Sequence, residues 1–403
     1  MVHIKEFAVE HWMDSYETWA THNMAETCCA SVSLKDLVVI SSKNDLLDII
    51  DFEQKQVYGA IRGSDPLRSN ISNLYKSEGC APLPKDNILV TNGAIQANFL
   101  ALYTQVGPGD HVICHYPTYQ QLYSVPESLG AEVSLWKAHE QNGWQLGLEE
   151  LKSLLRPNTK MIIINNPQNP TGAVIGRPTL QGVVDIARQH GIIIHSDEVY
   201  RPLFHSLPDG AEQPPSILSF GYENTVATGS MSKAFSLAGI RVGWIASPNS
   251  DIIQKCASTR DYTTISVSQV DDRIATYALS EPTVHNLLRR NIELARKNLD
   301  ALEEFLKGFS WAVEWVRPQA GTTAFVKFMN KDGKPVNDVE FCKRLQEQTG
   351  VMLVPGSRCF GEGLEFGGYV RIGFVPEHQV VLDGLRALRP FMETDYGNLP
   401  VHM

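Results

Sequence analysis

Residues 224–244 read NTVATGSMSKAFSLAGIRVGW and contain a single lysine among small and hydroxyl-bearing residues. The run 225–227 predicts a short buried strand, and the residues after it lead to Lys233. Arg241 follows eight residues later, between two glycines. Hydroxyl groups and an arginine around one lysine suit an anion that binds next to an amine. A lysine that forms an imine must be deprotonated, and we expect neighbouring positive charge and burial to lower the pKa of Lys233.

Before this stretch, short apolar runs alternate with helical patterns. Strands are expected at 88–91, 111–115, 132–136, 159–164 and 191–195, and helices at 93–103, 148–155 and 180–190. This alternation predicts an α/β fold with a mostly parallel sheet covered on both faces. In such sheets the functional site lies beyond the carboxyl ends of the strands. Gly93, Asn169, Asp197 and Lys233 each follow a predicted strand, so we expect them to lie together.

Aromatic residues recur at helical spacing near the start of the chain, at Trp12, Tyr16 and Trp19. They predict an amphipathic helix that packs against the core or a second subunit. The alternative is that these aromatic residues line a substrate site. Residues 34–42 are expected to form a short strand, and residues 44–52 a short helix.

The C-terminal part of the chain changes character. Residues 284–306 form a long charged helical pattern without glycine or proline, which we expect to link two domains. After it we expect a hairpin-like strand pair, two more strands and two helices, at 311–316 and 322–328, at 351–354 and 369–374, and at 340–348 and 380–391. The predicted division is a large domain, 46–284, and a smaller α+β domain made of 1–45 and 285–403, with an N-terminal arm.

Composition places the chain among ordinary globular proteins. Its 403 residues are 43% hydrophobic and 20% charged, with a formal net charge of −10, which fits two domains. The absence of a Lys/Arg-rich run argues against nucleic acid as a partner. No apolar run reaches the roughly 18–20 residues of a membrane helix, and the first residues lack the apolar core of a secretion signal. We therefore expect a cytoplasmic protein without a membrane partner.

Seven scattered cysteines include no CxxC pair. An odd number without such spacing argues against a disulfide framework and a structural zinc site, and it fits a reducing cytosol. The adjacent pair Cys28-Cys29 is expected to be two small buried residues. No metal site is predicted.

Four motifs in order carry a resemblance to a known family. They are NPQNPTG at 166–172, SDEVY at 196–200, Ser-x-Ser-Lys at 230–233 with an arginine eight residues on, and VRIGF at 370–374. Together they resemble the class I/II aminotransferases, the fold-type I enzymes that depend on pyridoxal 5′-phosphate (PLP). The resemblance covers roughly residues 45–390. It implies a large domain with a mostly parallel seven-stranded sheet, a smaller α+β domain, and PLP as the cofactor.

The resemblance implies a role for each matching residue. Lys233 would hold PLP as an internal aldimine and then move the α-proton of the substrate. Asp197 would pair with the ring nitrogen, and Arg371 would grip the substrate carboxylate as a bidentate fork. The other implied contacts are the backbone of Gly93, Ala94 and Ile95 with Ser230, Ser232 and Arg241 at the phosphate, Tyr200 and Asn169 at the ring oxygen, Tyr119 at the ring face, and Asn169 also at the substrate.

One implied contact involves a second subunit. Tyr58 matches a tyrosine that reaches the phosphate of the neighbouring subunit. The resemblance therefore implies a homodimer with shared active sites and a small amino acid as the substrate.

The implied reaction is amino-group transfer between an L-amino acid and a 2-oxo acid. The alternative is a C–S β-lyase or an amino-acid cyclase of secondary metabolism, which the same residues would serve. Two departures from the family pattern bear on the substrate: residues 23–33 lack the usual glycine-rich loop, and Ala94 stands where many relatives carry a hydroxyl. The sequence offers no clear second arginine for a dicarboxylate, although Arg62, Arg201 or Arg260 could serve.

Overall fold

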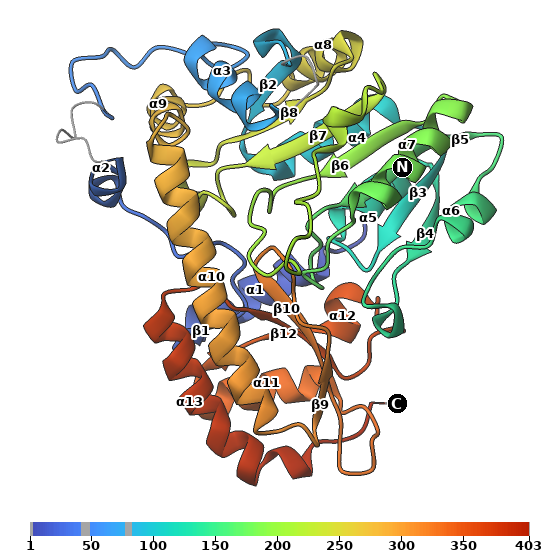
Figure 1. Ribbon diagram of the computed structural model, residues 1–403, viewed down its shortest axis with the longest axis vertical. Coiled ribbons are helices and arrows are strands. Elements are labelled where there is room, and N and C mark those ends of the chain that lie inside the picture. Colours follow the sequence, from blue (N-terminus) through green and yellow to red (C-terminus); the bar gives the residue numbers. More distant parts are fainter. Residues whose placement is uncertain (1–2, 42–48, 77–82, 403) are drawn as a thin grey trace.

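The computed structural model describes residues 3–41, 49–76 and 83–402, and it is built around a seven-stranded sheet (Figure 1). In spatial order the strands are β2 (Ile88–Thr91), β8 (Gly243–Ala246), β7 (Thr225–Ser230), β6 (Ile193–Asp197), β5 (Thr159–Asn165), β3 (His111–Tyr116) and β4 (Glu132–Lys137). β8 is antiparallel to both of its neighbours, and the pairs from β7 to β4 are parallel. The predicted α/β fold with a mostly parallel sheet is confirmed.

Helices cover both faces of this sheet, as a mostly parallel arrangement requires. Because side chains alternate between the faces of a strand, Val112 and Cys114 of β3 join one hydrophobic cluster and Ile113 joins the other. The first cluster includes residues of α4 (Gly93–Gln105), α5 (Gln121–Ser128) and α8 (Ser250–Arg260), and the second includes residues of α3 (Asp65–Leu74), α6 (Leu148–Leu154), α7 (Arg177–His190) and α9 (Gln269–Ala278). The central strands are therefore buried on both sides, whereas β4 at the edge is partly exposed.

A second, smaller sheet is formed by the C-terminal part of the chain. Its antiparallel strands, in spatial order, are β12 (Val354–Pro355), β13 (Tyr369–Gly373), β10 (Thr323–Phe328) and β9 (Val313–Trp315). α11 (Asp338–Thr349) and α12 (Gly356–Phe360) contact this sheet, and α13 (His378–Thr394) packs against α11. The predicted hairpin-like pair and closing helix are confirmed. The strand expected at 351–354 is two short strands, β11 (Val351–Met352) and β12.

The N-terminal segment packs against the C-terminal part. α1 (Ala8–Tyr16) continues into one turn of 3₁₀ helix, η1 (Glu17–Trp19), and β1 (His22–Asn23) pairs in parallel with β11. Trp12 is fully buried, and its indole N–H donates a hydrogen bond to the Leu353 carbonyl at 2.9 Å. The predicted helix is confirmed, and Trp12 packs in the core.

The strand expected at 34–42 is wrong, because Leu34–Ser41 form helix α2. The Asp36 carboxylate accepts a hydrogen bond from the Ser33 N–H at 2.9 Å, and the Ser33 hydroxyl oxygen accepts one from the Asp36 N–H at 3.1 Å. This reciprocal capping begins a helix in a run whose apolar residues resemble a strand. The helix expected at 44–52 falls largely on residues 42–48, which lie outside the described residues.

α10 (Thr283–Lys307) runs alongside both sheets (Figure 1). It contacts α9 beside the large sheet and α13 beside the small one. We propose that the two sheets mark two domains with the predicted limits, 46–284 against 1–45 and 285–403. Among the described residues, no helix combines the length and apolar character needed to cross a membrane.

Candidate active site

A cavity of about 470 Å³ lies beyond the carboxyl ends of β5, β6 and β7, at the N-terminus of α4. β13 and the N-terminal segment also contribute to its lining. The sequence-predicted residues that line it are Ala94, Ile95, Tyr119, Asn169, Asp197, Tyr200, Ser230, Ser232, Lys233, Arg241 and Arg371. Their convergence follows from the parallel sheet, whose strand ends meet at one edge.

Hydroxyl groups and a guanidinium meet at the start of α4. The Ser230 hydroxyl donates to the Ser232 Oγ at 2.9 Å, and the Arg241 Nη1 donates to the same Oγ at 3.4 Å. Gly93 has a φ of +76°, and a Cβ there would lie 2.8 Å from the Arg241 Nη2. Free N–H groups at a helix N-terminus, together with a guanidinium, form a site for a phosphate. We call Gly93, Ser230, Ser232 and Arg241 the anion cradle.

The backbone of Arg241 adopts a conformation that is uncommon for a residue with a side chain. Its φ is +52°, in the left-handed region. Such strain costs on the order of 1–3 kcal/mol and is concentrated at functional sites. In this conformation the Arg241 Nη1 also donates to the Ala238 carbonyl at 2.9 Å, which fixes the guanidinium within the anion cradle.

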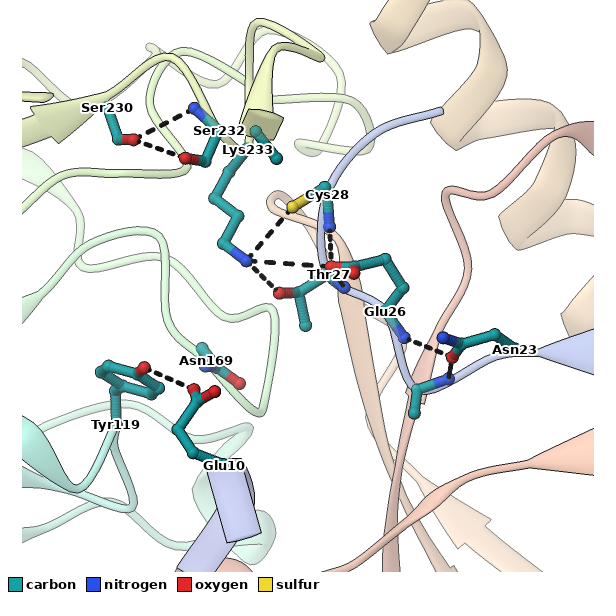
Figure 2. Close-up of polar contacts among 12 residues, drawn as sticks. Glu10, Asn23, Glu26, Thr27, Cys28, Tyr119, Asn169, Ser230, Ser232 and Lys233 are labelled. Carbon is teal, nitrogen blue, oxygen red and sulfur yellow. Dashed lines mark hydrogen bonds and ion pairs between the residues drawn. The ribbon is translucent and has the colours of Figure 1, made fainter. Parts of the chain in front are cut away.

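The Lys233 side chain points toward the N-terminal segment (Figure 2). Its amine donates to the Thr27 Oγ1 at 2.6 Å and to the Cys28 Sγ at 3.4 Å, and the Glu26 Oε1 lies 3.9 Å away. Burial alone would lower the pKa of Lys233, yet the ionised forms of Cys28 and Tyr200 and the Glu26 carboxylate raise it above its ordinary value. The expected lowering is therefore wrong, because the neighbours of the amine are acidic groups.

Asp197 ends β6 and is only 3% exposed. Its carboxylate accepts hydrogen bonds from the Asn98 Nδ2 at 3.0 Å and from the Val199 N–H at 3.2 Å. Burial raises the pKa of Asp197 to about 6, and these hydrogen bonds oppose the shift. Asn98, which sequence reasoning missed, is fixed by the Thr228 hydroxyl, which donates to its Oδ1 at 2.6 Å. Within the described residues the carboxylate forms no salt bridge, so it suits a cationic partner.

Three more of the predicted residues border the same space. Tyr200 is buried, and the Tyr119 hydroxyl donates to the Glu10 Oε1 at 2.6 Å (Figure 2). The N–H of Asn169 donates to the Asn165 Oδ1 at 2.7 Å, which fixes the loop after β5. These contacts place two phenol rings and an amide around the cavity.

Arg371 comes from β13 of the small sheet and is 4% exposed. Its Nη2 donates to the Ala25 carbonyl at 2.9 Å, and its Nη1 donates to the Asn169 Oδ1 at 3.4 Å. Its Nε has no hydrogen-bond partner in the described part of the chain. Because a buried donor without a partner is costly, this guanidinium suits a carboxylate bound in the cavity.

Some residues predicted from the sequence do not line the cavity. Tyr58 is 80% exposed and borders a different surface hollow, beside α9. Arg62, Arg201 and Arg260 donate to acceptors outside the cavity. Gly93 itself does not line the cavity, although its neighbours Ala94 and Ile95 do.

Sequence reasoning missed the polar groups that the N-terminal segment brings to the cavity, which are Glu10, Glu17, Glu26, Thr27 and Cys28. The expected burial of Cys28 and Cys29 is confirmed, but Cys28 also contacts the Lys233 amine. Burial raises the pKa of the Cys28 thiol to about 11, so it is a neutral thiol at neutral pH. The one signal in the sequence was the missing glycine-rich loop at 23–33.

These residues fit the cofactor that the resemblance implies. The anion cradle fits its phosphate, and the Lys233 amine fits its aldehyde. Asp197, which forms no salt bridge within the described residues, fits a protonated ring nitrogen. The chemistry of the donor set therefore matches PLP.

Comparison with known proteins identifies the family. The family model described as aminotransferase class I and II matches residues 31–382. Aspartate aminotransferase from Thermotoga maritima is 31% identical over 354 residues, which cover 86% of this chain and 87% of that protein. Capreomycidine synthase from Streptomyces vinaceus is 29% identical over 330 residues, 82% of this chain and 79% of that protein.

A solved structure agrees with the family match. A PLP-dependent aminotransferase from Streptococcus suis has a TM-score of 0.87 and 40% sequence identity, and the match covers 97% of this chain and 98% of that one. The shared fold thus extends across both sheets. With the family match over most of the sequence, this chain belongs to the class I and II aminotransferase family.

Proposed function

We propose that the protein is a PLP-dependent aminotransferase that moves an amino group between an L-amino acid and a 2-oxo acid. The observation that carries this proposal is a single cavity lined by Lys233, Asp197, Arg371 and side chains of the anion cradle. In that order, they match the aldehyde of PLP, its ring nitrogen, the substrate carboxylate and the phosphate of PLP. The likeness to aminotransferases from Streptococcus suis and Thermotoga maritima supports it.

Each residue has a separate task in this proposal. Bound PLP supplies a conjugated ring that withdraws electrons from the bonds at the substrate α-carbon. Asp197 holds a proton at the ring nitrogen, Arg371 binds the α-carboxylate, and the Lys233 Nζ takes and returns the α-proton. The anion cradle, with the backbone of Ala94 and Ile95, holds the phosphate. Tyr119, Tyr200 and Asn169, which line the same cavity, would border the ring.

Cyclisation of an amino acid is a second candidate function. It is favoured by the match to capreomycidine synthase, at 29% identity over 82% of the chain. The residues that hold the cofactor serve either reaction, and they serve a C–S β-lyase equally. The three reactions differ in the product released, so the product decides between them.

We further propose a homodimer with shared active sites. Ile95, Phe99 and Tyr103 of α4 are 40%, 38% and 50% exposed and recur every four residues, so they form an apolar stripe, here called the α4 stripe. Exposed apolar surface of this kind marks interfaces. Ile95 also lines the cavity, so a second subunit on the stripe would adjoin the active site. Tyr58 is exposed and therefore free to contact that subunit.

A cytoplasmic location belongs to the same proposal. The cysteines that the structure describes are all free thiols. Free thiols are typical of a reducing compartment, which supports this location.

The decisive experiment gives the PLP-loaded enzyme single amino acids without a 2-oxo acid. An aminotransferase converts one equivalent per site and then stops, because the cofactor has taken up the amino group and no 2-oxo acid is present to accept it from the cofactor. Turnover resumes when a 2-oxo acid is added. Sustained release of pyruvate and ammonia would identify a β-lyase, and a ring product that keeps its nitrogen would identify a cyclase. Lys233→Ala is expected to abolish turnover, and near-normal turnover of that variant would contradict the proposal.

A further inference from the structure

We propose that the active site selects amino acids whose side chain ends in a cation, such as a guanidinium or an ammonium group. This inference rests on the proposed function. Glu10, Glu17 and Glu26 line the same cavity as Lys233 and Arg371. Glu10 and Glu17 have no task in holding the cofactor, so they remain available to the substrate side chain, whereas Glu26 also lies 3.9 Å from the Lys233 amine.

Helical spacing brings two of the carboxylates to one face of the N-terminal helix. Glu10, Met13 and Glu17 are three and four residues apart, which places them on one side of α1 and the turn η1. All three line the cavity, whereas Trp12 is fully buried. Phe7 and Met13 add apolar lining, which suits the methylene chain of a long cationic side chain.

The charges on this face are not compensated. Within the described residues, Glu10 and Glu17 form no salt bridge; Glu10 accepts a hydrogen bond from Tyr119 at 2.6 Å, and Glu17 accepts one from Asn23 at 3.2 Å. Glu17 is an exposed residue, but partial desolvation raises the pKa of its carboxyl group, and the charges of Glu26 and Glu10 raise it further. Glu17 therefore lies in the negative potential of the other two carboxylates, and a cation placed there would be stabilised.

Glu26 adds a fixed negative charge. Its Oε1 accepts hydrogen bonds from the backbone N–H groups of Thr27 at 2.6 Å and Cys28 at 2.8 Å. Burial acts to raise the pKa of Glu26, but Lys233 and these hydrogen bonds hold it below its ordinary value. Glu26 is therefore ionised at neutral pH.

Arg371 supplies the positive charge that binds the α-carboxylate, which all amino acids share. It is 4% exposed, lines the same cavity, and has an Nε without a partner among the described residues. The other cations in the lining are Lys233 and Arg241, which the proposed function assigns to the cofactor. A second carboxylate on the substrate would therefore meet glutamates, and a dicarboxylic amino acid is disfavoured.

The test uses two inert probes, δ-guanidinovalerate and its neutral isostere δ-ureidovalerate. Both lack the α-amino group, so they bind without reacting, and calorimetry on the PLP-loaded enzyme gives their dissociation constants. The wild type is expected to bind the guanidino probe at least about tenfold more tightly. Glu17→Gln and Glu10→Gln should each reduce this ratio by about threefold or more. Asp14→Asn is the matched control: Asp14 lies on the same helix and is exposed, does not line the cavity, and should leave the ratio unchanged.

Equal affinity of the wild type for the two probes would overturn the inference, as would an unchanged ratio in both glutamine variants. Absorbance of bound PLP and circular dichroism verify that the variants are folded. The binding readout is independent of turnover. Selective binding without amino transfer to a 2-oxo acid from arginine, ornithine or lysine would count against the aminotransferase and keep the selectivity. Equal kcat/KM for arginine and citrulline would refute the selectivity and keep the aminotransferase.

Discussion

Lys233 and Asp197 lie in contrasting surroundings within one cavity. The Lys233 amine contacts Thr27 and Cys28 with Glu26 nearby, whereas Asp197 accepts hydrogen bonds from neutral groups. Burial raises the pKa of Asp197 to about 6, so the protonated, neutral form persists at pH values above the ordinary pKa of a carboxyl group. A cationic ring nitrogen beside Asp197 would reverse this shift, because it would stabilise the carboxylate. In the cofactor-free chain, ionisation of the buried Asp197 should therefore lower the free energy of unfolding.

We expect Asp197→Asn to remove part of the pH dependence of folding stability in the cofactor-free protein. The pKa of Asp197 is raised in the folded state, so its stabilising contribution is fully present below about pH 4 and is lost as the pH rises through about 6. Between about pH 4 and pH 7, the wild type should lose up to about 3 kcal/mol of unfolding free energy relative to the variant.

Denaturant unfolding at the two pH values, followed by fluorescence, measures this difference. Asp209→Asn changes an exposed carboxylate and serves as the control, which should follow the wild type. Parallel pH profiles for the wild type and Asp197→Asn would show that the buried carboxyl group does not titrate in this range.

At the scale of elements, β8 and α4 meet through a close backbone contact. Gly243 of β8 pairs with Thr91 at the end of β2, two residues before α4 begins at Gly93. A Cβ on Gly243 would lie 2.4 Å from the Gly93 carbonyl carbon and 2.5 Å from the Ala94 nitrogen. Both are backbone atoms, so the start of the helix would have to move. The strand therefore sets where the helix N-terminus meets the anion cradle.

Gly243→Ala is expected to weaken PLP binding by about tenfold or more, because the displaced helix N-terminus no longer faces the phosphate. Overpacking should also cost about 1–3 kcal/mol of stability. Spectroscopic titration of the cofactor-free protein with PLP measures the affinity. Gly239→Ala is the matched control, because a Cβ there meets nothing within 4 Å. Equal PLP affinity in the two variants would refute this role of β8.

The elements that carry motifs could be predicted from the sequence, and those that depend on partners could not. Asp197 and Lys233 follow short runs that alternate with helical patterns, which favours parallel strands, so their meeting at one sheet edge follows from topology. By contrast, α2 was predicted as a strand because its apolar run outweighed the capping pair Ser33 and Asp36. Glu10 and Glu17 belong to no motif, and only the folded position of α1 brings them to the cavity.

At the scale of the whole molecule, one chain does not complete the contact implied for Tyr58. Its side chain is 80% exposed and is absent from the cavity lining. The start of α4 is tied to the loop after α8, since the Gln96 Nε2 donates to Thr263 and Thr264 at 2.9 Å. Tyr262 in that loop is 92% exposed, so the loop held by Gln96 carries a further exposed aromatic side chain. A second copy of the chain on this face would cover it and place a partner near the cavity.

A hybrid dimer tests whether Tyr58 serves the partner's site. Tyr58→Ala is expected to weaken PLP binding by about tenfold in the homodimer, as the loss of one phosphate hydrogen bond implies. Lys233→Ala chains and Tyr58→Ala chains are co-expressed with different tags, and the mixed dimer is purified.

If the sites are shared, the site that retains Lys233 receives Tyr58 from the other chain. That site should then bind PLP with wild-type affinity and turn over normally. If each chain supplies its own tyrosine, the only lysine-containing site lacks Tyr58, and its PLP affinity stays at the weak value of the Tyr58→Ala homodimer.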